Sequence, residues 1–134
     1  MFFSFAISDS SIFSAIQGLN DRFRNIYFGG LGVDMGIEFC LASKDPSGNP
    51  TSGIIRVDGS GVPNYSTSGI TWDGSCGATE ADVKNLSRWP TSDYYNIWVV
   101  RSICGSISGF GGVAGYAYYP GGAGVYDGTV IDNY

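Results

Sequence analysis

The sequence predicts a single α/β domain in which one helix packs on a twisted, mostly parallel sheet. Three observations predict this class. Apolar residues recur at three- and four-residue steps over residues 8–25. Several short runs further along are rich in β-branched and aromatic residues and are bounded by glycine-rich turns. The 134 residues show no linker or shift in composition, and this length suits one domain with a real core.

The first two elements are a strand and a helix. Residues 2–8, FFSFAIS, are expected to form a short and largely buried strand. In residues 8–25, Ile12, Ile16 and Phe23 fall on one helical face, whereas polar residues fall on the other. Ser8 can cap the helix, and Asp9 lies near its positive end. We expect this helix to cover one face of the sheet.

The middle of the chain is expected to be extended. Residues 36–43, GIEFCLAS, read as a strand, and Cys40 within it is expected to be a buried thiol. Residues 44–50, KDPSGNP, form a dense turn signal. Residues 52–61 are a candidate for another short extended piece.

The second half predicts one short helix followed by three strands. Residues 78–86 are expected to be helical, because Thr79 and Asp82 have the spacing of a capping box. Residues 94–103 give the strongest strand signal, with burial expected on both faces. Residues 112–120 alternate tyrosine with smaller residues and end at a proline, which favours an edge strand. Residues 127–132 are the last short strand.

Charge and composition exclude some classes of function. The net charge is −5 with seven thinly spread basic residues, so a nucleic-acid interface is not expected. No apolar run reaches the roughly 18 residues of a membrane helix. Charged residues are 14% of the chain, against roughly a quarter in an average domain, which favours a secreted protein. We expect no secretory signal within this sequence, because its N-terminal residues lack a positively charged region.

Cysteines and aspartates are the candidate disulfide and metal groups. Three cysteines cannot all pair within one chain, and Cys76 and Cys104, which flank glycine-containing loops, are the candidates for a disulfide. A zinc site is not expected from them, because no two have C-x-x-C spacing and no histidine exists. Several aspartates in polar turns are candidate ligands for calcium. Turn capping is the favoured role for these residues, because no D-x-D-x-D-G pattern occurs. These aspartates are Asp45, Asp58, Asp73, Asp127 and Asp132.

Five segments resemble, in their order and spacing, the upstream half of a metzincin zinc peptidase catalytic domain of the pappalysin type, which includes cytophagalysin- and ulilysin-like enzymes. They are LNDRFRN, IEFCLASKDPSGNPTSGIIRV, YYNIWVV, GYAYYPGG and DGTVID. The resemblance implies a five-stranded sheet, with four parallel strands, one antiparallel edge strand and a backing helix. The edge strand would form the rim of the substrate cleft, where Gly115, Tyr116, Ala117 and Tyr118 would hold the substrate backbone.

The residues themselves leave a plainer alternative open for this segment. An amphipathic edge strand can simply cover a core with its tyrosine rings and keep the hydroxyl groups in water. The flanking glycines and Pro120 fit either interpretation.

The catalytic motif of such peptidases, H-E-x-x-H-x-x-G-x-x-H, has no match, because the chain contains no histidine. No catalytic or metal-binding residue is therefore assigned, and zinc is implied only for a full-length relative. We expect residues 1–134 to be part of a catalytic domain, without the zinc helix and the C-terminal subdomain, and to be inactive alone. Its partner would be a peptide or protein substrate. The alternative is a non-catalytic structural or interaction module that self-associates through its Tyr- and Gly-rich edge strands.

Overall fold

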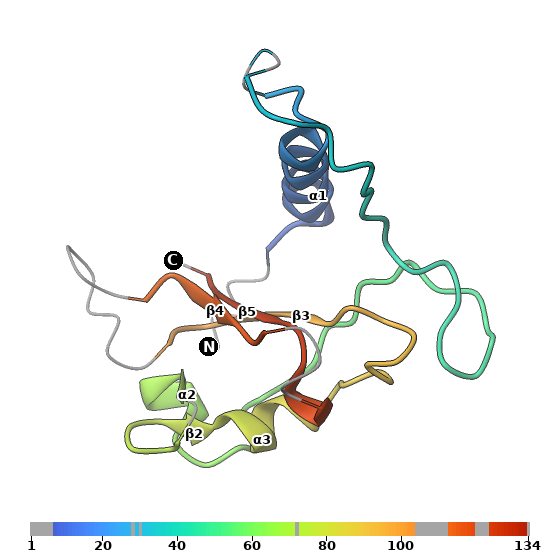
Figure 1. Ribbon diagram of the computed structural model, residues 1–134. Helices are drawn as coiled ribbons and strands as arrows, with labels where there is room; N and C mark the ends of the chain where they lie inside the picture. Colours follow the sequence, from blue (N-terminus) through green and yellow to red (C-terminus); the bar gives the residue numbers. More distant parts are fainter. Residues whose placement is uncertain are drawn as a thin grey trace. The chain divides into compact units, whose positions relative to one another are not determined.

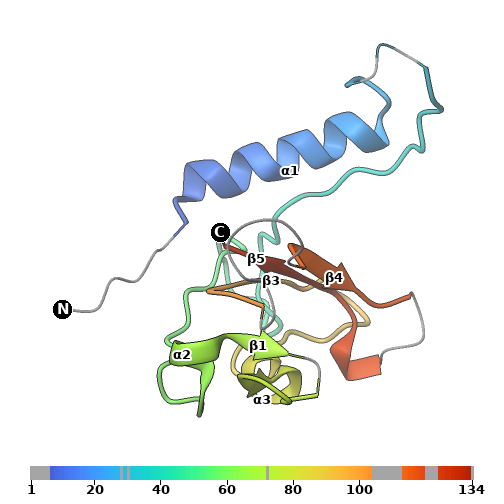
Figure 2. The same cartoon turned by 90° about the vertical axis from the view of Figure 1, so that its left-hand side faces the viewer.

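The computed structural model describes residues 7–27, 29, 31–71, 73–103, 113–119 and 124–133, and the chain divides into two units. These are Met1–Ile54 and Ile55–Tyr134, and each is described by itself. The strand predicted at residues 2–8 falls mostly outside the described residues. Figures 1 and 2 show the elements of each unit from two directions.

Helix α1, Asp9–Phe23, is the main element of the first unit. Ser8 caps it as predicted, since its hydroxyl oxygen accepts a hydrogen bond from the Ser11 N–H at 3.1 Å. Asp9 lies in the first turn and Arg22 in the last, where each charge opposes the local end of the helix dipole. The helical period of the sequence is thus confirmed.

The strand predicted at residues 36–43 is wrong, because this segment pairs with no other strand among the described residues. Its backbone is held instead by one side chain of α1. The Asn20 amide donates to the Phe39 carbonyl at 2.8 Å and accepts from the Phe39 N–H at 2.7 Å. The Phe39 ring also packs edge-on against Phe23, with ring centroids 4.9 Å apart. Asn20 therefore occupies the backbone groups that a neighbouring strand would use at this position.

Two further expectations for this region have different outcomes. The turn at residues 44–50 is confirmed, because Asp45 Oδ1 accepts hydrogen bonds from the Ser47 and Asn49 N–H groups. An isolated antiparallel bridge between Lys44 and Pro50 closes it. Cys40 is a free thiol but is exposed, so its predicted burial is wrong. The cause is the missing strand, which leaves the residue without a covering neighbour.

The second unit contains short helices and strands. Its helices are α2 (Tyr65–Ser68), α3 (Glu80–Lys84) and the 3₁₀ turn η1 (Gly124–Tyr126). Its strands are β1 (Ile70–Thr71), β2 (Ala78–Thr79), β3 (Ile97–Val100), β4 (Gly115–Ala117) and β5 (Thr129–Asp132). The predicted helix at 78–86 and the three strands that follow are thus present, each shorter than its pattern.

The strands form a two-stranded parallel sheet, β1-β2. They also form a three-stranded sheet with the order β3-β5-β4, which Figure 1 shows. In the larger sheet β3 and β5 are parallel, and β4 is an antiparallel edge strand. The class is therefore mixed α/β, but the described strands make no five-stranded sheet. The pairing of β3 with β5 ends at Val100. Beyond it, a single parallel bridge between Ile70 and Ile103 connects the two sheets.

A small core lies on one side of the larger sheet, where α3 packs (Figure 2). It consists of Val62, Ile70, Ala78, Val83, Trp98, Val100, Ile103 and Val130. Along β3, Trp98 and Val100 are buried, whereas Ile97 and Val99 are 41% and 43% exposed. Burial of this strand on both faces was therefore a wrong expectation. The alternation is that of a strand with one covered face.

Candidate functional site

Helix α3 brings an acid and a base together at the core. Thr79 caps the helix as predicted, because its hydroxyl oxygen accepts from the Asp82 N–H at 3.2 Å. The cap fixes the start of the helix, so Glu80 and Lys84 are separated by one turn and project to the same side. Both side chains are buried and form an ion pair between Glu80 Oε1 and Lys84 Nζ.

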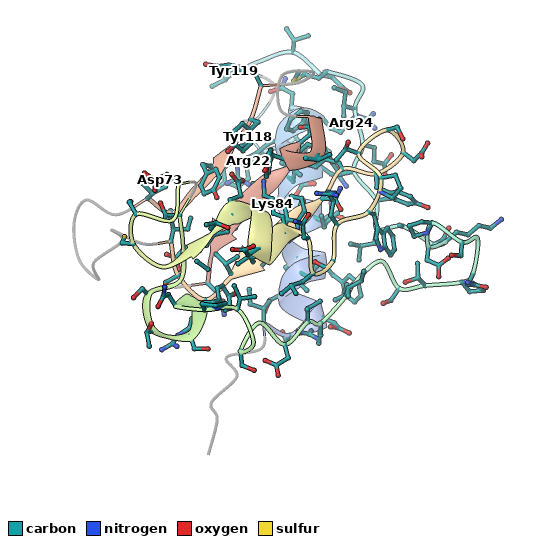
Figure 3. The ribbon with its side chains drawn as sticks, turned by 90° about the horizontal axis from the view of Figure 1, so that it is seen from below. Arg22, Arg24, Asp73, Lys84, Tyr118 and Tyr119 are labelled. Carbon is teal, nitrogen blue, oxygen red and sulfur yellow. The ribbon has the colours of Figure 1, made fainter. Side chains whose placement is uncertain are left out.

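The Lys84 ammonium group is surrounded by acceptors and aromatic rings. It donates to the Tyr126 carbonyl oxygen at 2.7 Å. It lies 4.5 Å from the centroid of the Trp98 ring, 5.1 Å from that of Tyr118 and 6.0 Å from that of Tyr116. Figure 3 shows Lys84 and Tyr118 with their side chains. We call Glu80, Lys84, Trp98, Tyr116 and Tyr118 the Lys84 cluster.

The two tyrosines connect the edge strand to this cluster. Tyr118, just beyond β4, donates its hydroxyl hydrogen to Glu80 Oε2 at 2.5 Å. Tyr116, within β4, packs against the core and meets the Tyr118 ring edge-on at 6.3 Å between centroids. Its hydroxyl oxygen is buried and has no hydrogen-bond partner among the described residues. The rings therefore cover the core, but the Tyr118 hydroxyl binds a carboxylate, unlike the water contact of the plainer interpretation.

The cluster shifts the ionisation of both tyrosines in the same direction. Burial raises the pKa of the Tyr116 hydroxyl, and the negative charge of Glu80 raises it further. Burial, followed by the hydrogen bond to Glu80 and the charge of that carboxylate, raises the pKa of Tyr118 to about 12. Both phenols are therefore neutral at physiological pH and can donate a hydrogen bond.

The ladder with β5 determines which backbone groups of β4 point away from the described sheet. The Asp132 N–H donates to the Ala114 carbonyl at 2.9 Å, and Tyr116 stands opposite Val130. Because hydrogen-bonded and non-bonded pairs alternate in an antiparallel ladder, the N–H and C=O groups of Gly115 and Ala117 point away from β5. They face the outer edge of the sheet. A methyl group at Gly115 would lie 2.8 Å from the Val130 carbonyl oxygen, so a larger residue would push the two strands apart.

The structure brings the predicted substrate-binding residues together at one edge. Gly115, Tyr116 and Ala117 form β4, and Tyr118 follows directly. Gly115 and Ala117 supply the backbone groups that point to the outer edge, whereas Tyr116 and Tyr118 supply the side chains that reach α3.

Of the two cysteines in the predicted disulfide, the structure describes only Cys76. Cys76 is disulfide-bonded, whereas Cys104 lies outside the described residues. Cys40, in contrast, has a free thiol, and the pairing of Cys76 with Cys104 stays a prediction.

The metal candidates are not gathered into a site. Among the described residues, no three His, Cys, Asp or Glu side chains lie close enough together to hold a metal ion. Asp45, Asp58 and Asp73 each accept a hydrogen bond from a backbone N–H two residues further on, which is the turn-capping role. The described helices also include none with the length and apolarity to cross a membrane.

Sequence reasoning missed Glu80, Lys84 and Trp98 as site residues. The signal that could have found the first two is a Glu and a Lys four residues apart within the predicted helix. That spacing usually marks an exposed pair, and burial arises here from Trp98 and Tyr126, which come from distant parts of the chain. In comparisons with known proteins, neither a family model nor a curated protein matches the chain.

Proposed function

We propose that the outer edge of β4 binds an extended peptide, which adds to the three-stranded sheet as a further strand. The observation that carries the proposal is the position of β4, which among the described strands pairs with β5 alone. Gly115 and Ala117 direct N–H and C=O groups that have no partner among the described residues to the outer side, where main-chain hydrogen bonds would supply the affinity. Ala117 and Gly115 are small, so they leave the approach to this edge open.

The wider proposal is that the chain is the substrate-cleft sheet subdomain of a secreted zinc-dependent endopeptidase of the pappalysin type. An antiparallel edge strand next to a parallel pair supports it, because the resemblance implies such a strand at the cleft. The disulfide at Cys76 supports an oxidising compartment. The residues of this chain do not fit zinc, since histidine is absent from the sequence. The function assigned to this chain is therefore peptide binding, and we expect no hydrolysis by it alone.

A titration tests peptide binding at β4. The probe is a capped octapeptide of alternating threonine and valine with a lysine at each end, which favours an extended backbone. We expect the amide NMR signals of Gly115 and Ala117 to shift in a saturable manner. Ala117→Pro should abolish the shifts, because proline removes the outward N–H, whereas Ala117→Val keeps that group and should bind. Equal binding by both variants, or shifts confined to other residues, would contradict the proposal.

A second experiment addresses the absence of hydrolysis. The purified chain should leave a quenched-fluorescence peptide library intact, both with added zinc and without it. Proteolysis that a chelator inhibits would show that this chain carries metal-dependent activity, and the assignment of peptide binding alone would be wrong.

Self-association through the exposed face or the edge of the sheet is the second candidate function. It is favoured by the face of the sheet on which Ile97, Val99 and Ile131 are each about two-fifths exposed. Sedimentation velocity distinguishes the two candidates. A discrete oligomer that Ala117→Pro disrupts would favour self-association, whereas a monomer that binds the octapeptide favours the peptide-binding edge.

A further inference from the structure

The environment of the Lys84 ammonium group has the composition of a binding site for a cation. Three aromatic rings, a carboxylate and a backbone carbonyl oxygen surround Nζ. Aromatic faces attract ammonium groups through their quadrupoles, and the attraction strengthens when water is excluded. Aromatic cages that recognise quaternary ammonium ligands use the same kind of contact between a cation and aromatic rings.

The site differs from an ordinary helical ion pair in its burial. The Lys84 and Glu80 side chains are 0% and 3% exposed, whereas Glu–Lys pairs on helices are usually in water. The partners also come from four separate segments: α3, β3, the β4 region and η1. Shortening Lys84 would thus leave a cavity lined by Glu80, Trp98 and Tyr118 that keeps its carboxylate. The Tyr116 hydroxyl, which lacks a hydrogen-bond partner among the described residues, adds a further polar group.

We propose that the Lys84 cluster is an ammonium-binding site with Lys84 as its resident ligand, which accepts a free primary alkylammonium ion when the Lys84 side chain is shortened. This goes beyond peptide binding and does not depend on it. The ligand class follows from size and charge. Lys84→Ala removes three carbon atoms and the nitrogen, so n-propylammonium has the matching composition. Quaternary ammonium ions lack the N–H groups that Lys84 directs to Glu80 and to the Tyr126 carbonyl.

Chemical rescue of Lys84→Ala tests the proposal. Alanine is the best helix former, so the substitution leaves the helical propensity of α3 intact. A ligand that binds the folded state alone raises its stability. We expect n-propylammonium chloride to raise the Tm of Lys84→Ala by about 4 °C or more over sodium chloride at equal ionic strength. The neutral analogue 1-propanol and tetramethylammonium should not raise it.

Two control variants separate site binding from a general amine effect. In Lys84→Met the methionine side chain fills the cavity, so n-propylammonium should leave its Tm unchanged. Lys44→Ala, at the exposed second lysine of the chain, should behave like the wild type. An equal response of all variants to n-propylammonium, or none in Lys84→Ala, would overturn the proposal. If Lys84→Ala is unfolded in buffer, recovery of the folded state on titration with n-propylammonium is the supporting result, and no recovery is the opposing one.

A measurement on the unmodified protein is independent of folding in any variant. Protons above aromatic rings are shielded, so the Lys84 ε-methylene signals should lie upfield of those of Lys44. Coincident chemical shifts for the two lysines would overturn the assignment of the rings as the walls of the site.

Discussion

Tyr118 donates its hydroxyl hydrogen to Glu80 at 2.5 Å, and this contact connects the end of β4 with helix α3. The two residues are 38 positions apart in the sequence. Glu80 is simultaneously paired with Lys84, so the strand, the helix and the buried cation share one carboxylate. A substitution of Tyr118, Glu80 or Lys84 should therefore change the interactions of the other two side chains.

Removing the Tyr118 hydroxyl should destabilise the second unit. Tyr118→Phe leaves one oxygen of the buried Glu80 carboxylate without its donor. Hydrogen bonds to charged groups contribute about 1.5–3 kcal/mol, so we expect a loss of this size in the free energy of unfolding measured with urea. Tyr119→Phe is the matched control, because Tyr119 is 90% exposed. Similar losses in both variants would show that the hydrogen bond is not the cause.

Stability should fall at high pH because of Tyr116 and Tyr118. Their pKa values are raised in the folded state, that of Tyr118 to about 12, so the folded protein holds these protons more tightly than the unfolded chain. Their stabilising contribution is complete below pH of about 10, the ordinary tyrosine pKa, and is lost as the pH rises towards 12. Urea midpoints measured across this range should decrease. Tyr118→Phe should show a shallower decrease, and an equal slope would contradict the assignment.

Removing one member of the Glu80–Lys84 pair should lower the free energy of unfolding more than replacing both members. Lys84→Met leaves a buried carboxylate unpaired, and we expect a loss of about 3–5 kcal/mol in the free energy of unfolding. The double variant Glu80→Gln/Lys84→Met removes both charges and should recover a large part of that loss. Guanidinium denaturation of the single and double variants gives the comparison. A double variant less stable than Lys84→Met would mean that the charges themselves stabilise the fold.

Cys76 and Cys40 should respond differently to substitution. Cys76→Ser removes a disulfide and should lower the free energy of unfolding by about 2–4 kcal/mol. Cys40→Ser should have little effect, because Cys40 is an exposed free thiol. Under native conditions a maleimide reagent should modify Cys40, and mass spectrometry of the tryptic peptides identifies the site. Protection of Cys40 in the native protein would contradict its exposure.

The elements that the sequence predicts correctly are those whose signals come from residues close together in the sequence. The α1 period, the Thr79 cap and the tyrosine alternation that ends at Pro120 are local signals, so α1, α3 and β4 could be expected from them. The strand at residues 36–43 was wrong because a strand exists only with a partner, and Asn20 binds the backbone of Phe39 instead.

The candidate site was predictable in part. The edge position of β4 follows from the Tyr–Gly pattern and the proline. The Lys84 cluster does not, because burial of Lys84 depends on Trp98 and on the Tyr126 carbonyl, which meet α3 only in the folded chain. The same holds for the outward-pointing backbone groups of Gly115 and Ala117, which are determined by the register of β4 against Val130 and Ile131.

The complete burial of Lys84 has a practical consequence for attaching this protein to surfaces or dyes. The chain has two lysines, Lys84 and the exposed Lys44. Reagents that acylate amines under native conditions should therefore modify Lys44 and the N-terminal amine and leave Lys84 unmodified.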